Sequence, residues 1–329
     1  MRETLIQQFL ASAGLGSAQR IALPSDASFR HYERIKNGEK NFILMNAPPP
    51  KEDVRPFVRI AVFLEKNGFS TPHIFSEDTE NGFLLLEDFG SALYTAILDG
   101  NHTTSLEDEI YRRAADVLVA LHKITPPDFP AAYDNALLLR EVKLFTEWYL
   151  PYAEIELSEK AKTEYEEILL TLFPYLKKQK PVLVLRDYHA DNLIYLSERE
   201  GYKKVGLLDF QDAVIGSPAY DLVSLLEDAR RDVPPALREK ILDYYLSLNL
   251  DTDAENFRAC YSILGAQRNL KIIGIFTRLA VRDGKKRYLY FLPRVWKHLE
   301  NDFQHPVLAP LKTWLDENIP VGKIRNENR

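Results

Sequence analysis

The sequence predicts an α+β fold with two lobes. Residues 1–90 alternate short apolar runs with turn signals around one long amphipathic helix, which indicates a small β-rich lobe. Residues 91–329 instead carry long segments with apolar residues at helical spacing, separated by three short apolar runs. Two of these runs lead into an aspartate, Asp187 and Asp209. We therefore expect an N-terminal lobe up to residue 90 and a mainly helical C-terminal lobe that carries carboxylate chemistry.

The elements of the first lobe follow from local spacing. A helix is expected over residues 3–13, where apolar residues recur every three or four positions. The Asn37-Gly38 pair lies between two apolar runs and is typical of a β-hairpin. A second helix is predicted over residues 54–67 and a buried strand over residues 82–86. Residues 87–90 then close the lobe.

The elements of the second lobe are predicted in the same way. Helical periodicity covers residues 106–124, 137–149, 158–178 and 253–282. Short strands are expected at residues 182–185, 193–196 and 205–208. No internal repeat interrupts this order.

The composition excludes several classes of protein. The 329 residues are 46% hydrophobic and 27% charged, which is typical of a globular chain rather than a disordered one. The net charge is −6, from 42 basic and 48 acidic residues, so nucleic acid is not an expected partner. No apolar run approaches the roughly 18 residues of a membrane span, so a membrane is not an expected partner either.

Cysteine usage and the N-terminus bear on the compartment. Cys260 is the only cysteine, so no intrachain disulfide can form. Residues 1–16 place Gln7 and Gln8 inside their one apolar stretch, which is not typical of a signal peptide. We therefore expect a cytoplasmic protein.

The strongest chemical signal lies in residues 182–221. Asp187 follows a predicted buried strand, Asn192 comes five residues later, and Asp209 ends the next apolar run but one. Phosphoryl transfer needs such a set, because one Asp orients the attacking hydroxyl while an Asn and a second Asp hold Mg²⁺ against the nucleotide phosphates. Side chains at strand ends are also held rigidly. The segment therefore predicts a phosphotransferase site.

These motifs resemble the aminoglycoside-phosphotransferase group of the kinase-like superfamily. Residues 186–192 (RDYHADN) are similar to its His-Gly-Asp-x-x-x-x-Asn catalytic loop, with Leu185-Arg186 standing in place of His-Gly. Residues 207–212 (LLDFQD) resemble its metal-binding Asp segment. Residues 216–222 (GSPAYDL) resemble its downstream motif, whose Asp, here Asp221, is usually structural.

The resemblance implies a protein-kinase-like, aminoglycoside-phosphotransferase-like fold with ATP and Mg²⁺ as cofactors. It makes Asp187 the catalytic residue that accepts or orients the acceptor proton, and Asn192 and Asp209 the metal ligands. Asp221 would then hold the catalytic loop through backbone N–H groups. His122, in a helical Leu-His pair common in the family, is expected to be structural.

Further segments are similar to one branch of that superfamily, the bacterial anomeric kinases of N-acetylmuramate and N-acetylglucosamine. They lie at residues 25–32, 42–49, 82–90, 145–149, 265–279 and 282–285. This resemblance implies an amino-sugar substrate, transfer of the ATP γ-phosphate to the C1 hydroxyl, and a role in peptidoglycan recycling. The preferred sugar, the anomer and the oligomeric state stay open.

The nucleotide contacts depart from those of ordinary kinases. The Gly-rich phosphate loop is replaced by residues 25–30 (SDASFR), of which Ser28, Phe29 and Arg30 are candidate nucleotide contacts. Met45 occupies the position of the usual strand lysine and cannot bind a phosphate. Arg30 is our candidate for the substitute cation.

The hinge and the small-lobe helix supply further candidates. Glu87 and Phe89 follow a buried strand, where adenine would take backbone hydrogen bonds, although a plain surface turn is the alternative. Glu65 on the predicted helix either orients Arg30 or is merely exposed.

Substrate contacts are expected from two helical segments. Arg268, Lys271 and Arg278 fall near one helix face, which is either a solvated face or a site where Arg268 captures the lactyl carboxylate of N-acetylmuramate. Trp148 and Tyr149 are either core residues or a stacking surface for the sugar ring.

Other functions remain open at this point. A kinase of the same fold could use an aminoglycoside, choline or homoserine. The methionine at position 45 also allows a nucleotide-binding pseudokinase scaffold. His189 and Asp191 suggest a dinuclear hydrolase only weakly, since no second histidine is near in sequence. Asp212 is either a second metal contact or a loop residue.

Overall fold

The computed structural model describes residues 1–24, 29–100, 102–249 and 251–320. The chain divides into two compact units. Unit 1 comprises residues 1–117 together with 191–213, and unit 2 comprises residues 118–190 together with the chain from Val214 onward. Among the described residues no helix is both long and apolar enough to cross a membrane.

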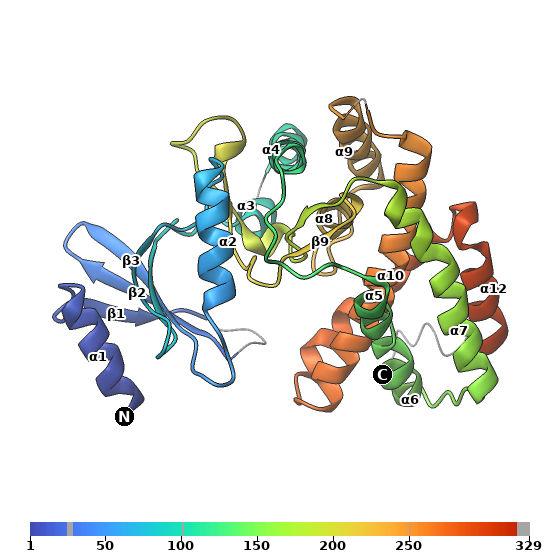
Figure 1. Cartoon of the computed structure of the whole chain (residues 1–329), viewed down its shortest axis with the longest axis horizontal. Coiled ribbons are helices and arrows are strands. Elements are labelled where there is room, and N and C mark those ends of the chain that lie inside the picture. The colour runs from blue at the N-terminus through green and yellow to red at the C-terminus, as the bar shows by residue number, and fades with distance from the viewer. Residues whose placement is uncertain (25–28, 101, 250, 321–329) are drawn as a thin grey trace. The chain divides into compact units, whose positions relative to one another are not determined.

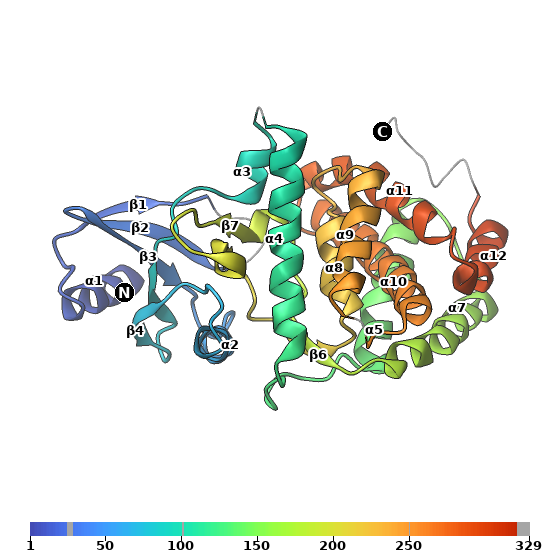
Figure 2. The ribbon, with the colours of Figure 1, turned by 90° about the horizontal axis from the view of Figure 1, so that it is seen from above.

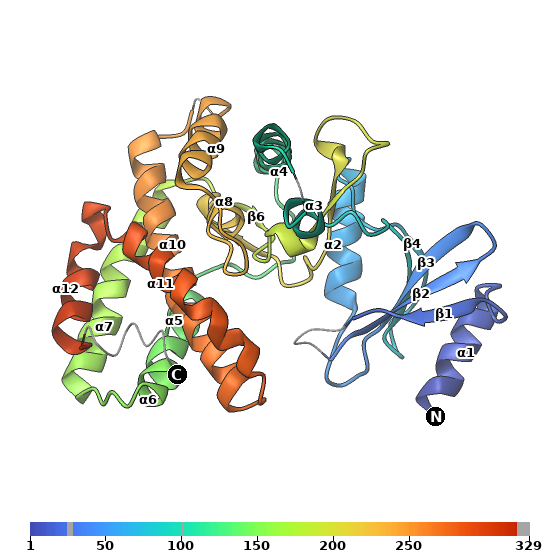
Figure 3. The same cartoon turned by 180° about the vertical axis from the view of Figure 1, so that it is seen from behind.

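Unit 1 is built on a five-stranded antiparallel sheet, which Figures 1 and 3 show from opposite sides. The strands run in the order β1-β2-β3-β5-β4, with bounds Gln19–Ala22, His31–Asn37, Lys40–Asn46, Phe83–Glu87 and Ile74–Asp78. The predicted hairpin is confirmed, since Asn37 pairs with Lys40 across the turn at Gly38. Gly38 has φ 61°, a left-handed backbone that such a two-residue turn requires.

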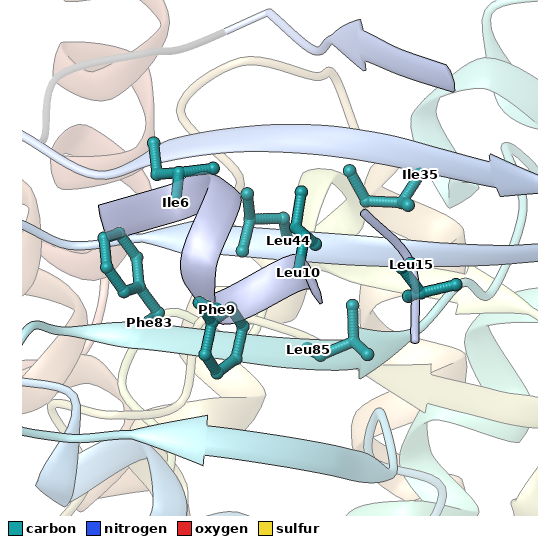
Figure 4. Packing of buried hydrophobic residues seen from close by; sticks show 8 residues of the cluster. All are labelled: Ile6, Phe9, Leu10, Leu15, Ile35, Leu44, Phe83 and Leu85. Atoms are coloured by element: carbon teal, nitrogen blue, oxygen red, sulfur yellow. The ribbon is translucent and has the colours of Figure 1, made fainter. Parts of the chain in front are cut away.

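Helix α1 (Arg2–Ser12) covers one face of this sheet with the apolar residues that predicted it. Its buried side chains meet alternate strand residues, as the close view in Figure 4 shows. The cluster comprises Ile6, Phe9, Leu10, Leu15, Ile35, Leu44, Phe83 and Leu85. Helix α2 (Arg55–Lys66) likewise buries one face of its own, in agreement with the predicted amphipathic helix.

Residues 191–213 fold with unit 1 rather than with the residues that precede them. Strands β7 (Leu193–Tyr195) and β8 (Val205–Leu207) pair antiparallel with each other. The Tyr195 N–H donates to the Ala92 carbonyl (2.8 Å), and short bridges join Ser70 to Gly206 and Leu93 to Ile194. The compact unit therefore extends beyond residue 90, and the functional boundary at that residue stays a prediction.

The remaining elements of unit 1 are α3 (Tyr94–Leu98), the first part of α4 (Thr104–Lys123) and the short η4 (Gly201–Lys204). Helix α4 runs on into unit 2. It agrees with the helix predicted over residues 106–124.

Unit 2 is mainly helical and contains one short strand pair. Strand β6 (Val182–Val184) pairs antiparallel with β9 (Val214–Gly216). Its long helices are α5 (Asn135–Val142), α7 (Glu159–Leu172), α8 (Ala219–Leu226), α9 (Pro235–Ser247), α10 (Ala254–Val281), α11 (Leu292–Asp302) and α12 (Ala309–Asn318). Shorter helical turns are η1 (Phe145–Tyr149), α6 (Leu150–Tyr152), η2 (Phe173–Lys178), η3 (Ala190–Asn192, which begins here and ends in unit 1), η5 (Lys286–Phe291) and η6 (Pro306–Leu308).

Helix α10 packs against α5, α8, α11 and η1 and forms the centre of unit 2 (Figure 2). The helix predicted over residues 137–149 is divided, because α5 ends at Val142 and a π-helical turn covers Phe145–Tyr149. A close helix crossing accompanies the division: a Cβ atom on Gly274 of α10 would lie 2.3 Å from the Leu144 carbonyl carbon. Only glycine allows that approach.

Candidate active site

The loop after β6 carries the predicted catalytic residue Asp187, and Asp221 of α8 holds the start of this loop. One Asp221 carboxylate oxygen accepts the Leu185 N–H (2.7 Å), and the other accepts the Arg186 N–H (2.8 Å). The predicted structural role of Asp221 is thereby confirmed. Burial raises the pKa of Asp221 to about 7, although the two N–H donors oppose that rise.

A second buried carboxylate reaches the end of the same loop. Asp228, which follows α8, accepts a long hydrogen bond from the Ala190 N–H (3.4 Å). Between the two anchors the chain turns tightly, since the Asp187 N–H donates to the Leu185 carbonyl (2.9 Å) and the His189 N–H to the Asp187 carbonyl (3.2 Å). The backbone around Asp187 is thus fixed at both ends.

Asp187 lies among cationic side chains of unit 2. Burial raises the pKa of its carboxyl, but the charges of Lys271, His189, Arg186 and Arg268 lower it more, so the net shift is downward. Asp187 is therefore ionised at neutral pH. That state is the one required to accept or orient the proton of an acceptor hydroxyl.

Arg186 occupies a left-handed backbone conformation with φ 71°. Its guanidinium forms an ion pair with the buried carboxylate of Glu141 on α5, and it lies 5.6 Å from the centre of the Tyr133 ring. A residue with a Cβ atom is disfavoured at this backbone geometry, and glycine is not. This explains why the family motif that the loop resembles has Gly here. In this chain Arg186 is instead stabilised by its ion pair with Glu141.

Glu141 connects Arg186 with α10. Its second carboxylate oxygen lies 3.3 Å from the Lys271 Nζ and also accepts the Tyr133 hydroxyl. The Lys271 Nζ donates in turn to the Tyr220 hydroxyl (3.2 Å). Glu141 was not a candidate from the sequence; the one available signal was an arginine at a glycine position, which needs an acidic partner.

In unit 1 the two predicted metal ligands lie at the ends of the paired strands β7 and β8. The Leu208 N–H donates to the Asn192 carbonyl (3.0 Å), so Asn192 and Asp209 flank the same end of this ladder. Asp209 has φ 56° and a side chain that is 43% exposed. The strain of such a backbone is typical of functional residues.

The guanidinium of Arg30 lies next to the Asp209 carboxylate. A cation that binds the nucleotide phosphates would have to lie near this predicted metal ligand. Its NH1 group donates to Asp209 Oδ1 (3.2 Å), and its Nε donates to Glu52 (3.1 Å). The idea that Glu65 orients Arg30 is wrong, because Glu65 pairs with His73 (2.8 Å) and is about half exposed. Arg30 is held by Glu52 instead.

The other residues of the predicted phosphate loop give a partial view. Ser28 lies outside the described residues. Phe29 is 55% exposed, and its backbone N–H donates to Glu52 (3.1 Å). Met45 is buried in β3. Nucleotide binding by Ser28, Phe29 and Arg30 stays a prediction.

The predicted hinge residues pack within unit 1. Glu87 ends β5, its N–H donates to the His73 carbonyl (2.8 Å), and its carboxylate accepts from Arg199 (2.7 Å). The Phe89 ring packs over Gly206, where a Cβ atom would come within 2.8 Å of it. Adenine binding at Glu87 and Phe89 stays a prediction.

The predicted substrate residues differ in their surroundings. Arg268 is buried, with hydrogen bonds to Ser224 Oγ (3.0 Å) and the Glu227 carbonyl (3.2 Å), so the interpretation as a solvated residue is wrong. Tyr149 is buried and stacks on Phe145, with ring centres 5.5 Å apart. These contacts match the core interpretation of Tyr149.

The structure also places the remaining candidates from the sequence. Trp148 is half-buried and its role in sugar binding stays a prediction, as does that of Arg268. Asp212 is exposed and accepts from Gln211 (3.4 Å). His122 bonds to the Tyr245 hydroxyl (2.7 Å), and burial lowers its pKa to about 3, which confirms a structural role.

The residues around Asp209 fit a magnesium ion by their chemistry. Asn192 and Asp209 supply oxygen donors, which Mg²⁺ prefers. Within the described ranges no group of three or more Asp, Glu, His or Cys side chains forms a metal site. Magnesium in nucleotide enzymes takes one or two protein ligands and fills its shell with phosphate and water oxygens.

The α+β fold, together with the order and spacing of Asp187, Asn192 and Asp209 along the chain, is typical of kinase-like small-molecule phosphotransferases. The comparisons agree: the chain belongs to the phosphotransferase enzyme family, whose model matches residues 20–259. The expected family and fold are therefore confirmed, and the kinase class implies ATP as the phosphoryl donor.

Curated relatives cover almost the whole chain. An N-acetylmuramate/N-acetylglucosamine kinase of Caulobacter vibrioides is 37% identical, with 98% of each chain covered. A protein of the same name from Pseudomonas aeruginosa is also 37% identical, over 97% of this chain and 95% of that protein.

Solved structures share the fold at low sequence identity. The ADP-bound aminoglycoside phosphotransferase APH(2'')-Ib has a TM-score of 0.63 at 15% identity, covering 92% of this chain and 99% of its own. The choline kinase LicA of Streptococcus pneumoniae has a TM-score of 0.62 at 14% identity with the same coverage. At such identities these likenesses bear on the fold alone.

Proposed function

We propose that this enzyme is an anomeric amino-sugar kinase, which transfers the γ-phosphoryl group of ATP to the C1 hydroxyl of N-acetylmuramate, N-acetylglucosamine or both. The observation that carries the proposal is the anchored loop around Asp187, in a chain 37% identical to kinases of that name over nearly its full length. The intact Asp187, Asn192 and Asp209 argue against a pseudokinase scaffold.

Asp187 accepts or orients the proton of the anomeric hydroxyl as the sugar oxygen attacks the γ-phosphorus. The new bond joins O1 to phosphorus, the bond to the β–γ bridging oxygen breaks, and ADP leaves with that electron pair. An anomeric hydroxyl is more acidic than a simple alcohol, so an ionised carboxylate suffices for its proton. Positioning and charge neutralisation supply most of the rate.

Asn192 and Asp209 would hold Mg²⁺, which neutralises charge on the nucleotide phosphates when bound. Arg30 supplies a further positive charge beside Asp209, in place of the lysine that Met45 replaces. Its pairing with Glu52 fixes the direction of the guanidinium. These roles rest on the arrangement of the described residues of unit 1.

We place this reaction in the cytoplasm, where ATP is available and the single thiol of Cys260 stays reduced. Its chemistry suits the recovery of sugars released from peptidoglycan, because a C1 phosphate activates the sugar for further conversion. The product would serve an enzyme that acts on sugar phosphates.

The test is ATP consumption by the purified enzyme with Mg²⁺ and a panel of N-acetylmuramate, N-acetylglucosamine, kanamycin, choline and no acceptor. Phosphorus NMR of the sugar products is expected to show a phosphate at C1. Asp187→Ala is expected to lower kcat by at least about 100-fold, the usual contribution of a general base. The matched control is Asp243→Asn, whose carboxylate is exposed and pairs with Arg258.

The outcomes separate the alternatives. Turnover of kanamycin or choline instead of either sugar would contradict the amino-sugar assignment and keep the kinase class. Near-normal turnover by Asp187→Ala would contradict the role of Asp187. Tight ATP binding without turnover on any acceptor would favour the pseudokinase.

A further inference from the structure

Helix α10 presents one partly open face. Most of its residues from Phe257 to Ala280 are buried, but Lys271, Ile275 and Arg278 are only half-buried and Arg282 at its end is exposed. These positions are separated by three or four residues, so they form one stripe along the helix. Three of the four are cationic.

The three cations of this stripe differ in their partners. Lys271 bonds to Glu141 and Tyr220. Arg282 bonds to both carboxylate oxygens of Asp283, at 2.7 and 2.9 Å. The side chain of Arg278 forms no hydrogen bond or ion pair among the described residues, and its Nε is buried without a partner.

This situation is costly for Arg278. Desolvation and the neighbouring charge of Arg282 lower its pKa, and the charges of Asp283 and Glu147 offset that only in part. A guanidinium has five N–H donors, and a buried donor without an acceptor destabilises the folded state. An external anion would relieve both the charge and the missing hydrogen bonds.

The stripe runs from the catalytic carboxylate of unit 2. Among the charged side chains, Lys271 has the largest effect on the pKa of Asp187. It precedes Arg278 by seven residues, or about 10 Å along the helix. The arginine side chain is long, so its guanidinium can lie closer to Lys271 than the backbone of Arg278 does. Between them, Gly274 touches the Leu144–Phe145 backbone, so the turn that carries Trp148 borders the same part of α10.

We propose that Arg278 binds the carboxylate of an acidic amino-sugar substrate, as a specificity residue of the kinase inferred above and resting on that function. A guanidinium fork matches a carboxylate in a bidentate geometry. N-acetylmuramate carries a lactyl carboxylate, whereas N-acetylglucosamine has a free hydroxyl at that position. Arg278 is the better assignment than Arg268, whose guanidinium is already bound to Ser224 and Glu227 inside the protein.

The experiment compares kcat/KM for the two sugars in the wild type, Arg278→Gln and Arg282→Gln. In Arg278→Gln the ratio of N-acetylmuramate to N-acetylglucosamine is expected to fall at least about tenfold, the loss of one charge-assisted bond. Arg282→Gln is the matched control, one turn further along α10, and its ratio is expected to stay within twofold of the wild type. The methyl ester of N-acetylmuramate has no carboxylate, so its kcat/KM should be the same in the wild type and in Arg278→Gln.

The result also separates this assignment from the proposed function. If the wild type phosphorylates the sugars but the ratio is unchanged in Arg278→Gln, the assignment of Arg278 is wrong and the kinase stands. If the wild type phosphorylates neither, the proposed function fails, and calorimetric titration of N-acetylmuramate decides the rest. Binding that is lost in Arg278→Gln supports the carboxylate site, and absence of binding to the wild type overturns it.

Discussion

The guanidinium of Arg186 pairs with the buried carboxylate of Glu141, and Arg186 directly precedes Asp187, the proposed catalytic residue. The backbone of Arg186 is left-handed, which costs about 1–2 kcal/mol for a residue other than glycine. The ion pair and the two N–H bonds to Asp221 offset this cost. We therefore expect the conformation of the loop at Arg186 and Asp187 to depend on the charge of Glu141 on α5.

Replacement of Glu141 tests this dependence. Glu141→Gln keeps the shape of the side chain but leaves Arg186 and Lys271 without their common anion. We expect a loss of about 3 kcal/mol in the free energy of unfolding, the usual effect of removing one partner of a buried pair. Chemical denaturation measures it, with Glu166→Gln as control, whose partly exposed pair with Lys143 should be worth less than about 1 kcal/mol.

A double-mutant cycle with Arg186→Gly isolates the pair. Glycine accepts the left-handed backbone and removes the guanidinium, so Glu141→Gln should cost clearly less in the Arg186→Gly background. Equal costs in both backgrounds would show that Glu141 acts independently of Arg186.

Lys271 controls the ionisation of Asp187. Among the charges that lower the Asp187 pKa, that of Lys271 has the largest effect, so Lys271→Met should raise this pKa. The acid limb of the pH profile of kcat/KM, which follows deprotonation of the base, should then move to higher pH. Arg282→Gln should leave the limb in place, and an unmoved limb in Lys271→Met would contradict this role.

The sequence predicted best what is local along the chain. Asp187, Asn192, Asp209 and Asp221 follow fixed steps after apolar runs, and the structure places them at strand ends or against the loop backbone, where those steps lead. The short strands next to Asp187, Asn192 and Asp209 were predicted for the same reason, since strand periodicity is a property of short windows. The helix that carries Asp221, α8, was not predicted.

Contacts between distant segments were not accessible from the sequence. Arg30 pairs with Glu52 and not with Glu65. Which carboxylate lies next to Arg30 depends on the course of the loops in space, and helical periodicity does not predict that course. Glu141 had no motif. The break in the helix predicted over residues 137–149 accompanies the close crossing at Gly274, which lies more than 120 residues away in sequence.

Asp221 makes stability depend on pH in a defined direction. Its folded-state pKa of about 7 is above the ordinary aspartate value near 4, so the folded state keeps a proton that the unfolded state has lost. The stabilisation from this group is complete below about pH 4 and is lost as pH rises through 7. Asp221→Asn cannot titrate, so the difference in unfolding free energy, wild type minus variant, should fall between pH 4 and 8.

Denaturation curves of both proteins at several pH values measure that difference, and other titrating groups cancel in the subtraction. A difference that rises with pH would mean that the two N–H donors outweigh burial at Asp221. The same carboxylate would then have a lowered pKa.

Arg30 is predicted to bind the nucleotide rather than the sugar. Arg30→Met keeps an unbranched side chain of similar length but removes a cation that pairs with Asp209. We expect the KM for ATP to rise about tenfold, as for a lost charge-assisted hydrogen bond, with little change in the KM for the sugar. Arg20→Met is the matched control. Arg20 lies on the edge strand β1 and also forms two ion pairs in unit 1, with Glu3 of α1 and Glu33 of β2. A rise in the sugar KM alone would assign Arg30 to the acceptor, and equal effects of Arg20→Met and Arg30→Met would reduce its role to the stability of the sheet.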